Sequence, residues 1–521
     1  MNKPASAPAA ALQEASRLAS QGRLPQAAQL LRQHLQAQPG DALAWQMLGL
    51  MHLMSSQWPD AASALEQSAA LNGQDARTWA MLGVACSQQG RVQQAISHFD
   101  AAVALAPADA ALWCDRGRAL HAAQRLEEAL ASADRALSLN PAQPAAWLLR
   151  GNTLRDHAVS YLLAGVLETH ERNAFRVIGL DACVKAVPDT PMRQRVLAAF
   201  DEYVALGRCT PEEAANRIRA LRLDVLIDLM GATGDGQASV VLLRPAPLQV
   251  AWLGFPGTSG MDEIDYILAD RHVVPPGSEG EFSECVVRLP DTFQPNDSQR
   301  VISPVTPTRA SQGLPASGFV FCCHNNTYKI LPGMFDIWMR LLHAVPGSVL
   351  WLVNDGEYAR ANLREQAARR GIAADRLVFA ERCDYPDYLA RYRLADLFLD
   401  TLPFNAGTTA SDALWAGLPV LTQTGRSFAG RMAASLLHAV GLPELVTQTA
   451  DEYEALALRL ATHAQELAAL RQRLNQQGRA SALFDTARLT RHLEQALLTM
   501  CQRQQQGLPP QGFDVPALPA A

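Results

Sequence analysis

The sequence predicts a helical repeat array followed by two lobes of mixed α/β structure. The repeat is visible in four tryptophans that each lie 34 residues after the last, Trp45, Trp79, Trp113 and Trp147. After residue 170, short apolar runs alternate with helical stretches, a pattern typical of strand–helix units around a parallel sheet. A chain of 521 residues is long enough for two or three such domains.

Small residues keep step with the tryptophans. The glycines that follow each tryptophan are Gly49, Gly83, Gly117 and Gly151. The small residues of each second helix are Ala27, Ala61, Ala95 and Ala129. A 34-residue period with this composition is typical of tetratricopeptide repeats (TPRs), in which each unit is a pair of helices. Small residues let paired helices approach closely, so we expect a stack of helix pairs.

The repeat period sets the first boundaries. We expect a disordered start at 1–7 and a TPR array at 8–155, with four repeats and then a half repeat. The full repeats are expected at 8–41, 42–75, 76–109 and 110–143. The half repeat contains Trp147 and Gly151 but then breaks, because the bulkier Leu163 stands where a small alanine is expected.

Two successive sets of apolar runs follow, and they suggest paired Rossmann-like lobes with a cleft between them. The domains are expected at 156–300 (first lobe), 301–315 (linker), 316–503 (second lobe) and 504–521 (disordered, Pro-rich tail). The first lobe's strands are expected at 175–180, 223–229, 248–253, 265–269 and 285–289. The second lobe's strands are expected at 318–323, 348–353, 376–380, 396–400 and 418–422. Low order is expected over about 295–315, which is rich in Pro, Ser and Thr.

Composition excludes several classes of protein. Charged residues make up 18% of the chain and the net charge is -6, so no basic surface for nucleic acid or membrane lipid is expected. No apolar run is long enough to span a membrane, and the start lacks the apolar core of a signal peptide. The cysteines form no C-x-x-C pair, which argues against zinc and disulfides. We therefore expect a cytoplasmic protein.

Three segments at the ends of predicted strands could carry chemistry. The Gly/Pro-rich loop within 244–260 could approach a ligand closely, although composition alone leaves an ordinary turn equally open. In 399–412, Thr408 and Thr409 open a helix whose free N–H groups suit a diphosphate, and Asp412 could reach a ribose hydroxyl. An ordinary helix N-cap would look the same. Lys329 could neutralise a leaving phosphate, but a lone lysine is more often solvated.

Together these segments resemble one family. The chain contains R-P-A-P-L-Q-V-A-W-L-G-F-P-G-T-S-G from Arg244, N-N-T-Y-K ending at Lys329, and T-T-A-S-D-A-L-W-A-G from Thr408. This combination is similar to the O-GlcNAc transferases, repeat-bearing glycosyltransferases of the GT-B fold. The resemblance implies an inverting transfer of GlcNAc from UDP-GlcNAc to Ser/Thr hydroxyls of polypeptides bound along the TPR groove. It implies no cofactor and no metal ion.

The resemblance also implies roles for particular residues. His157 matches a histidine beside the donor sugar and acceptor, where it positions them. Lys329 matches the lysine that stabilises the leaving diphosphate. The implied contacts to the donor are Leu253, Gly254 and Pro256 at the sugar, Asn326 at the donor, Cys383, Tyr388 and Arg391 around the uracil, and Gly407, Thr408, Thr409 and Asp412 at the diphosphate and ribose. Gly407 stands where many members of the family have histidine.

One departure concerns the fold. The family's first lobe opens with a strand of the type L-R-[VI]-G-[YF]-V-S about ten residues before the histidine. Here the same interval belongs to the last half repeat, so we expect residues 145–152 to be helical and the first lobe to lack its opening strand. A parallel sheet without that strand loses hydrogen bonds and buried apolar area.

Two alternatives therefore stay open. The chain could be a peptide-binding TPR scaffold with a degenerate, inactive transferase domain. It could also be an enzyme of the same fold that uses UDP-glucose or modifies asparagine, because few pocket contacts decide the choice of donor.

Overall fold

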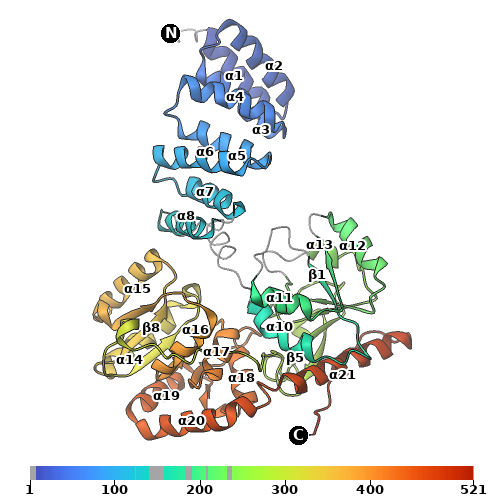
Figure 1. The fold of residues 1–521 in the computed structure, drawn as a ribbon, viewed down its shortest axis with the longest axis vertical. Helices are drawn as coiled ribbons and strands as arrows, with labels where there is room; N and C mark the ends of the chain where they lie inside the picture. Colours follow the sequence, from blue (N-terminus) through green and yellow to red (C-terminus); the bar gives the residue numbers. More distant parts are fainter. Residues whose placement is uncertain are drawn as a thin grey trace. The chain divides into compact units, whose positions relative to one another are not determined.

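The computed structural model describes residues 7–123, 125–139, 158–181, 190–206, 209–231 and 238–519. The chain divides into two compact units, Met1–Arg155 and Asp156–Ala521, and each is described here by itself (Figure 1). The half repeat after residue 143, the expected helix at 145–152 and His157 lie outside the described residues.

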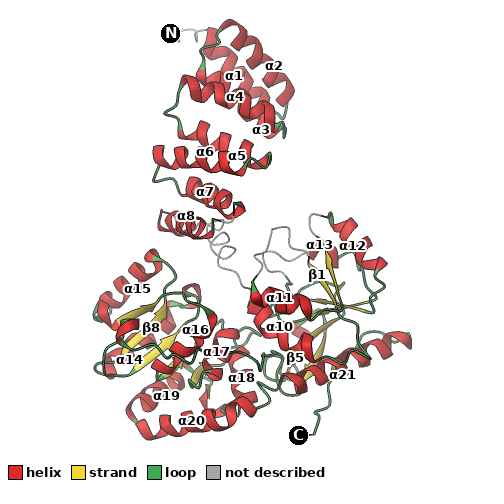
Figure 2. Ribbon diagram, viewed as in Figure 1, coloured by secondary structure: helices red, strands yellow, loops and turns green. Residues whose placement is uncertain are grey.

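The first unit is built of helix pairs, as the 34-residue period predicts (Figure 2). Helices α3, α5 and α7 begin one period apart, and each packs against the helix that follows it. The helices are α1 (Ala7–Ser20), α2 (Leu24–Ala37), α3 (Ala42–Met54), α4 (Trp58–Leu71), α5 (Ala76–Gln88), α6 (Val92–Leu105), α7 (Ala110–Ala122) and α8 (Leu126–Leu139).

Each tryptophan of the described repeats ties its unit to the preceding one. The indole N–H groups of Trp45, Trp79 and Trp113 donate to the carbonyl oxygens of Pro39, Gly73 and Pro107, at 2.9 Å in each case. An indole has a single donor, which is satisfied here while the ring packs against apolar neighbours. The repeated tryptophan therefore fixes both the packing and the end of the previous helix.

The repeated glycines have a steric reason. A Cβ at Gly49 would lie 2.5 Å from Cγ of Leu65, and a Cβ at Gly83 would lie 2.7 Å from the ring of Phe99. Ala61 and Ala95 are fully buried between the paired helices. Close approach within each pair therefore depends on these small residues.

The first lobe of the second unit contains a five-stranded parallel sheet in the order β13-β6-β5-β4-β3 and a separate two-stranded parallel sheet of β1 and β2. The strands are β1 (Ile178–Asp181), β2 (Glu202–Ala205), β3 (Val225–Asp228), β4 (Leu248–Ala251), β5 (Tyr266–Asp270), β6 (Cys285–Leu289) and β13 (Phe513–Asp514). The helices of this lobe are α10 (Ala158–Thr169), α11 (Pro191–Ala198), α12 (Pro211–Ala220) and α13 (Ala238–Val241).

The described residues of this lobe form two separate sheets, and the expected loss of the opening strand concerns residues outside the described ones. Within the described residues, β1 pairs only with β2, and β3 pairs only with β4. Every residue of β3 is half-buried, whereas β5, in the interior of the sheet, is buried throughout. Among the described residues, both β1 and β3 are thus edge strands, although a parallel sheet of this kind is normally covered and continuous.

The C-terminal segment corrects two expectations. Residues 504–519 are not a disordered tail, because helix α21 (Thr486–Gln505) continues into them and β13 then pairs with β6. Helix α21 also packs on the first lobe beside α10 rather than completing the second lobe (Figure 1). The reason is an apolar stripe at helical spacing, which enters the first-lobe core through Leu489, Leu493, Ala496 and Met500.

The second lobe is one parallel sheet in the order β12-β11-β10-β7-β8-β9. Its strands are β7 (Val320–Cys323), β8 (Val349–Val353), β9 (Leu377–Ala380), β10 (Leu397–Leu399), β11 (Val420–Gln423) and β12 (Val446–Thr447). Its helices are α14 (Pro332–Ala344), α15 (Glu357–Arg369), α16 (Tyr385–Arg391), α17 (Thr408–Trp415), α18 (Met432–Val440), α19 (Ala450–Thr462) and α20 (Ala464–Gln477). Cys322 and Cys323 are fully buried in its core.

The start of the expected low-order linker is ordered, and Pro295 to Asp297 and Arg300 are buried, which corrects that prediction over residues 295–300. Asn296 and Asp297 are 1% exposed, and Asn296 donates to the carbonyl oxygen of Leu483. The polar composition of this stretch suggested a solvated loop, but its side chains are satisfied by partners distant in the sequence. Among the described helices, none combines the length and apolar character needed to cross a membrane.

Candidate active site

The second lobe's sheet reverses its order of strands between β10 and β7. The chain runs from β7 outward through β8 and β9 on one side, and from β10 outward through β11 and β12 on the other. Ligands of such sheets bind beyond the carboxyl ends of the strands at the switch point. Lys329 follows β7 and the segment 401–412 follows β10, so two of the three segments singled out in the sequence meet at this point.

Lys329 lies against the turn that follows β10. Its Nζ donates to the carbonyl oxygen of Asn405 at 3.1 Å and lies 4.0 Å from the ring centroid of Phe404. Burial lowers the pKa of Lys329 to about 8, and the nearby Asp400 carboxylate acts in the opposite direction. The ammonium is therefore poorly hydrated and available to interact strongly with an anion.

Asp400 organises this turn, and sequence reasoning assigned it no role. Its carboxylate accepts hydrogen bonds from the backbone N–H groups of Thr401 and Ala406, both at 2.8 Å, and from Oγ1 of Thr422 at 2.7 Å. Burial raises the pKa of Asp400 to about 6. The sequence offered one indication of this role, because Asp400 is an acidic residue at the end of an apolar strand. A buried carboxylate needs several hydrogen-bond partners.

Helix α17 begins at the same turn without a side-chain cap. Gly407 occupies the N-cap and supplies no side chain to the first-turn N–H groups, and Thr408 and Thr409 are half-buried beside it. An uncapped helix start suits an anion. A Cβ at Gly407 would lie 2.9 Å from Oε1 of Gln294, so any larger side chain at this position would require Gln294 to move.

Asp412, expected at a ribose, is buried in an internal network. Its Oδ1 accepts from Nη1 of Arg300 at 2.9 Å and from the hydroxyl of Tyr385 at 2.7 Å. Burial raises the pKa of this carboxyl, while the Arg300 guanidinium acts to lower it. Arg300, which sequence reasoning missed, also lies over the rings of Trp415 and Phe484. Asp412 therefore connects α17 to Arg300 at the end of the first lobe.

The residues expected around the uracil lie on and before α16. Arg391 is buried and donates to the carbonyl oxygen of Glu381 at 2.6 Å and to Sγ of Cys383. Cys383 is exposed, and Arg391 thus supports the loop that presents it. The hydroxyl of Tyr388 lies 2.6 Å from that of Tyr392.

Tyr385, on the same helix, contacts the first lobe. Its ring centroid lies 4.4 Å from that of Tyr161 on α10. Burial raises the pKa of Tyr385, so its hydroxyl stays protonated and donates to Asp412. Sequence reasoning missed this aromatic contact between the lobes.

The two asparagines after β7 have different environments. Asn325 is buried and donates to Oγ1 of Thr401 at 2.9 Å, so it links the two loops. Asn326, the expected donor contact, has an exposed side chain, and its carbonyl oxygen accepts from the N–H of Lys329. Only Asn326 of the pair presents a side chain to solvent.

The first lobe contributes the loop after β4. Leu253 has a φ of 73°, and a Cβ at Gly254 would lie 1.8 Å from the carbonyl oxygen of Leu229, so only glycine fits there. Pro256 is half-buried in the same loop. Leu253 and Phe404 pack against the same apolar cluster, which brings this loop to the turn that holds Lys329.

The polar residues that flank this loop hold its shape. Glu284 accepts from Oγ1 of Thr258 at 2.8 Å and from the N–H of Ser259 at 2.6 Å. Arg244 pairs with Asp265 at 2.8 Å. Much of the segment 244–260 thus has a structural function, and Glu284 is a support that sequence reasoning missed.

Comparison with known proteins gives the family. The model of glycosyl transferase family 41 matches residues 151–306 and 300–493. The chain belongs to this family. A tetratricopeptide repeat model matches 12–76, 47–110 and 81–145 in the other unit. The two family 41 matches meet near Arg300, whose side chain bonds to Asp412 across that division.

Several named proteins resemble this family 41 chain. It is 33% identical over 366 residues to the probable UDP-N-acetylglucosamine–peptide N-acetylglucosaminyltransferase SEC of Arabidopsis thaliana, which covers 69% of this chain and 37% of SEC. It is 26% identical over 466 residues to a Caenorhabditis elegans protein named as the same transferase, covering 68% and 40%. The chain thus spans well under half the length of these relatives.

A solved structure resembles the whole chain. A mutant O-GlcNAc transferase of Thermobaculum terrenum matches with a TM-score of 0.63 at 28% identity, covering 97% of this chain and 100% of that one. The helical TPR region followed by an α/β domain with parallel sheets therefore agrees with a GT-B transferase of family 41.

Proposed function

We propose that this chain is an inverting glycosyltransferase that moves GlcNAc from UDP-GlcNAc to Ser/Thr hydroxyls of polypeptides. The observation that carries the proposal is the position of the Lys329 ammonium beside the uncapped start of α17, at the switch point of the sheet. Membership of family 41 and the names of the relatives support the choice of donor and acceptor.

In this mechanism the acceptor oxygen attacks the anomeric carbon as the bond to the β-phosphate oxygen breaks on the opposite face. The leaving diphosphate gains negative charge during this step. Lys329 and the N–H groups of Thr408 and Thr409 are proposed to stabilise that charge, since fixed donors in a dry site act strongly on a developing anion. The acceptor hydroxyl loses its proton to water as its oxygen bonds to the anomeric carbon, and His157 is proposed to position that hydroxyl.

The other donor contacts follow the same assignment. Leu253, Gly254 and Pro256 are proposed to line the sugar pocket, because the close approach of Gly254 to Leu229 fixes that loop before a ligand arrives. The exposed Cys383 loop, supported by Arg391 and followed by Tyr388, is proposed to hold the uracil. Asn326 is proposed to contact the donor, and Asp412 the ribose.

The TPR array is proposed to bind the acceptor polypeptide. Stacked helix pairs form an extended concave surface that suits a peptide. This assignment separates acceptor binding in the first unit from donor binding in the second.

A second candidate is a TPR scaffold whose transferase domain binds UDP but does not transfer the sugar. The observation that favours it is the separate β1–β2 sheet, which leaves β3 at an edge of the first lobe. The second lobe holds Lys329 and α17 without those strands, so it could retain UDP even in an inactive protein.

The test is a donor panel with the full chain, in which released UDP is measured with UDP-GlcNAc and with UDP-glucose in the presence of a Ser/Thr-containing protein mixture. We expect UDP-GlcNAc to be preferred and Lys329→Ala to lower turnover by about a hundredfold or more. UDP binding without release from either donor would favour the scaffold. Preference for UDP-glucose would change the donor.

A further inference from the structure

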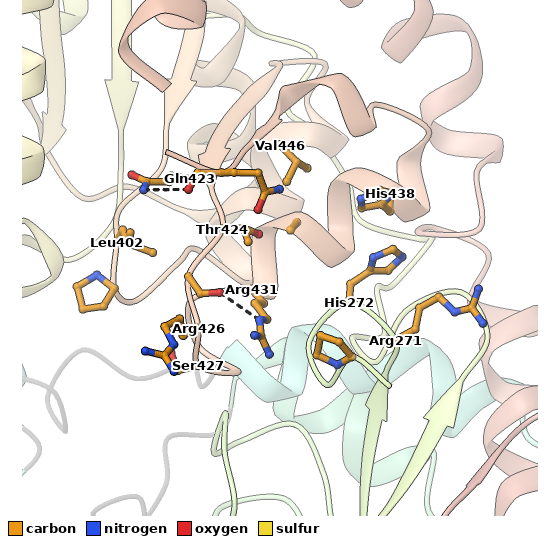
Figure 3. Close-up of a pocket in the computed structure, with 15 residues that line it drawn as sticks. Arg271, His272, Leu402, Gln423, Thr424, Arg426, Ser427, Arg431, His438 and Val446 are labelled. Carbon is orange, nitrogen blue, oxygen red and sulfur yellow. Dashed lines mark hydrogen bonds between the residues drawn. The ribbon is translucent and has the colours of Figure 1, made fainter. Parts of the chain in front are cut away.

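A cavity apart from the candidate active site lies between the two lobes of the transferase unit. Its volume is about 710 Å³, within the range of small-molecule sites. The first lobe contributes the residues that follow β5, and the second lobe contributes the loops after β10 and β11, one side of α18 and the segment around β12 (Figure 3). The lining consists of Arg271, His272, Pro275, Leu402, Pro403, Gln423, Thr424, Gly425, Arg426, Ser427, Arg431, Ala434, His438, Val446 and Gln448.

The charge of this lining is entirely positive. Arg271, Arg426 and Arg431 line the cavity, and no carboxylate does. None of these three arginines forms an ion pair with a described residue, whereas Arg288, Arg340 and Arg473 each pair with a glutamate. Arg271 and Arg426 are exposed, whereas Arg431 is half-buried and uses its Nε to donate to the carbonyl oxygen of Gly425 at 3.1 Å. Three cations with no carboxylate among the lining residues give the cavity a positive potential, which favours the binding of an anion.

Helix α18 adds a further positive group. Arg431 is its N-cap residue and makes no side-chain capping hydrogen bond, and Ala434 of the first turn lines the cavity. The first-turn N–H groups of a helix carry partial positive charge and favour an anion. This feature is independent of the arginine side chains, and it acts in the same direction.

Two imidazoles complete the cavity. His272 from the first lobe stacks on His438 of α18, with ring centroids 4.0 Å apart and planes 10° from parallel. Asp270, next to this pair, is fully buried and does not line the cavity; its carboxylate accepts from Oγ of Ser435 at 2.6 Å and acts to raise the pKa of both imidazoles. The histidines therefore offer further nitrogen atoms to a ligand at the contact between the lobes.

The cavity is distinct from the proposed donor site. None of the residues assigned to the donor lines it. The two sites share only the turn after β10, where Leu402 and Pro403 face the cavity and the next residue, Phe404, lies under Lys329. An occupant could thus affect the donor site through this turn without occupying it.

We propose that this cavity binds a small molecule bearing two or more phosphate charges, and that the molecule links the lobes through Arg271 on one side and Arg426 and Arg431 on the other. Guanidinium groups bind phosphate oxygens in pairs, and a helix start adds backbone donors. The cavity is also lined by the apolar side chains of Leu402, Pro403 and Val446, which can contact an organic portion of the ligand. Binding stabilises the lobes as one unit, since the two sets of contacts come from different lobes.

The test uses inorganic pyrophosphate as the probe and the full chain saturated with UDP, so that the donor site is already occupied. Calorimetry should detect pyrophosphate binding to the parent protein. The double variant Arg271→Gln/Arg426→Gln should bind at least tenfold more weakly. Both side chains are exposed and neither makes a hydrogen bond or ion pair within the described residues, so this variant should fold. Arg360→Gln, on α15 away from the cavity, is the matched control and should bind as the parent does.

A thermal melt with and without pyrophosphate gives a second readout. Pyrophosphate should raise the melting temperature of the parent and of Arg360→Gln, but not that of the double variant. The same differences should persist without UDP in a Lys329→Ala background, which separates this proposal from the proposed transferase activity. No pyrophosphate binding by the UDP-saturated parent, or equal binding by the double variant, would overturn the proposal.

Discussion

At the scale of single residues, the candidate site depends on buried charges whose partners are close. Asp400 fixes the turn that carries Asn405, and Asn405 accepts from Lys329. Burial changes the pKa of both ionisable groups in the direction of the neutral form, to about 6 for Asp400 and about 8 for Lys329. Between about pH 6 and about pH 8, Asp400 is therefore a carboxylate and Lys329 an ammonium, which is the pair of charges that the site requires.

The pH dependence of kcat/KM should follow from these values, because this quantity reports groups of the free enzyme. Activity should fall below about pH 6 as Asp400 is protonated and above about pH 8 as Lys329 loses its proton. Lys329→Arg should keep its charge at all accessible pH values, so any activity it retains should lack the alkaline decline. An unchanged alkaline limb in that variant would assign the decline to another group.

Asp412→Asn tests a residue with two partners. The variant keeps the shape and a hydrogen-bonding oxygen but removes the charge that faces Arg300. We expect weaker UDP binding by roughly 1.5–3 kcal/mol, the range for hydrogen bonds to charged groups. Calorimetry measures this effect, and a melting curve measures the separate loss of stability from an unpaired Arg300. A large loss of stability with unchanged UDP affinity would leave Asp412 a structural role alone.

At the scale of elements, the long periodic segments were predictable and the short ones were not. Helices α3 to α7 follow the repeat period because the same position of each repeat needs the same kind of side chain. Gly49, for example, must be small because Leu65 of the paired helix lies against it. The strands β12 and β13 contain two residues each, too few to show an alternating or apolar pattern, and β2 (Glu-Tyr-Val-Ala) has no continuous apolar run. They pair because neighbouring strands in space present free backbone groups, a signal absent from a local window of sequence.

The expected absence of the first lobe's opening strand leads to a prediction at this scale. Inserting a Leu-Arg-Ile-Gly-Tyr-Val-Ser segment with a short linker before Asp156 should offer β1 and β3 a shared neighbour and raise both thermal stability and turnover. In the natural chain, backbone amides of β1 and β3 should exchange faster than those of β5. The reason is that β1 belongs to a two-stranded sheet and β3 is the last described strand of the larger sheet, whereas β5 lies in its interior. Hydrogen exchange measures this order before and after insertion.

An insertion of equal length made of glycine and serine is the control. It should lengthen the chain at the same point without protecting β1 or β3. Equal effects of the two insertions, or slow exchange of β1 and β3 in the natural chain, would contradict the view that a strand is missing from this sheet.

At the scale of the whole molecule, the chain consists of two compact units that are proposed to divide acceptor and donor binding. Removing residues 1–143 should therefore abolish modification of whole-protein acceptors while UDP affinity stays as in the full chain. Modification of a short peptide should persist, since the reacting hydroxyl needs only the transferase unit. If the truncated protein modified large acceptors as fast as the full chain, the array would not be the acceptor site.

The sequence by itself determined the TPR array, the two α/β lobes and the three segments around Lys329, Thr408 and Gly254, because each of these depends on local spacing or on a continuous motif. Only the tertiary structure decided that α21 returns to the first lobe, that β13 completes its sheet and that Arg300 holds Asp412. These features join residues separated by a hundred positions or more. Their stability comes from burial and charge pairing between distant segments, which no local pattern records.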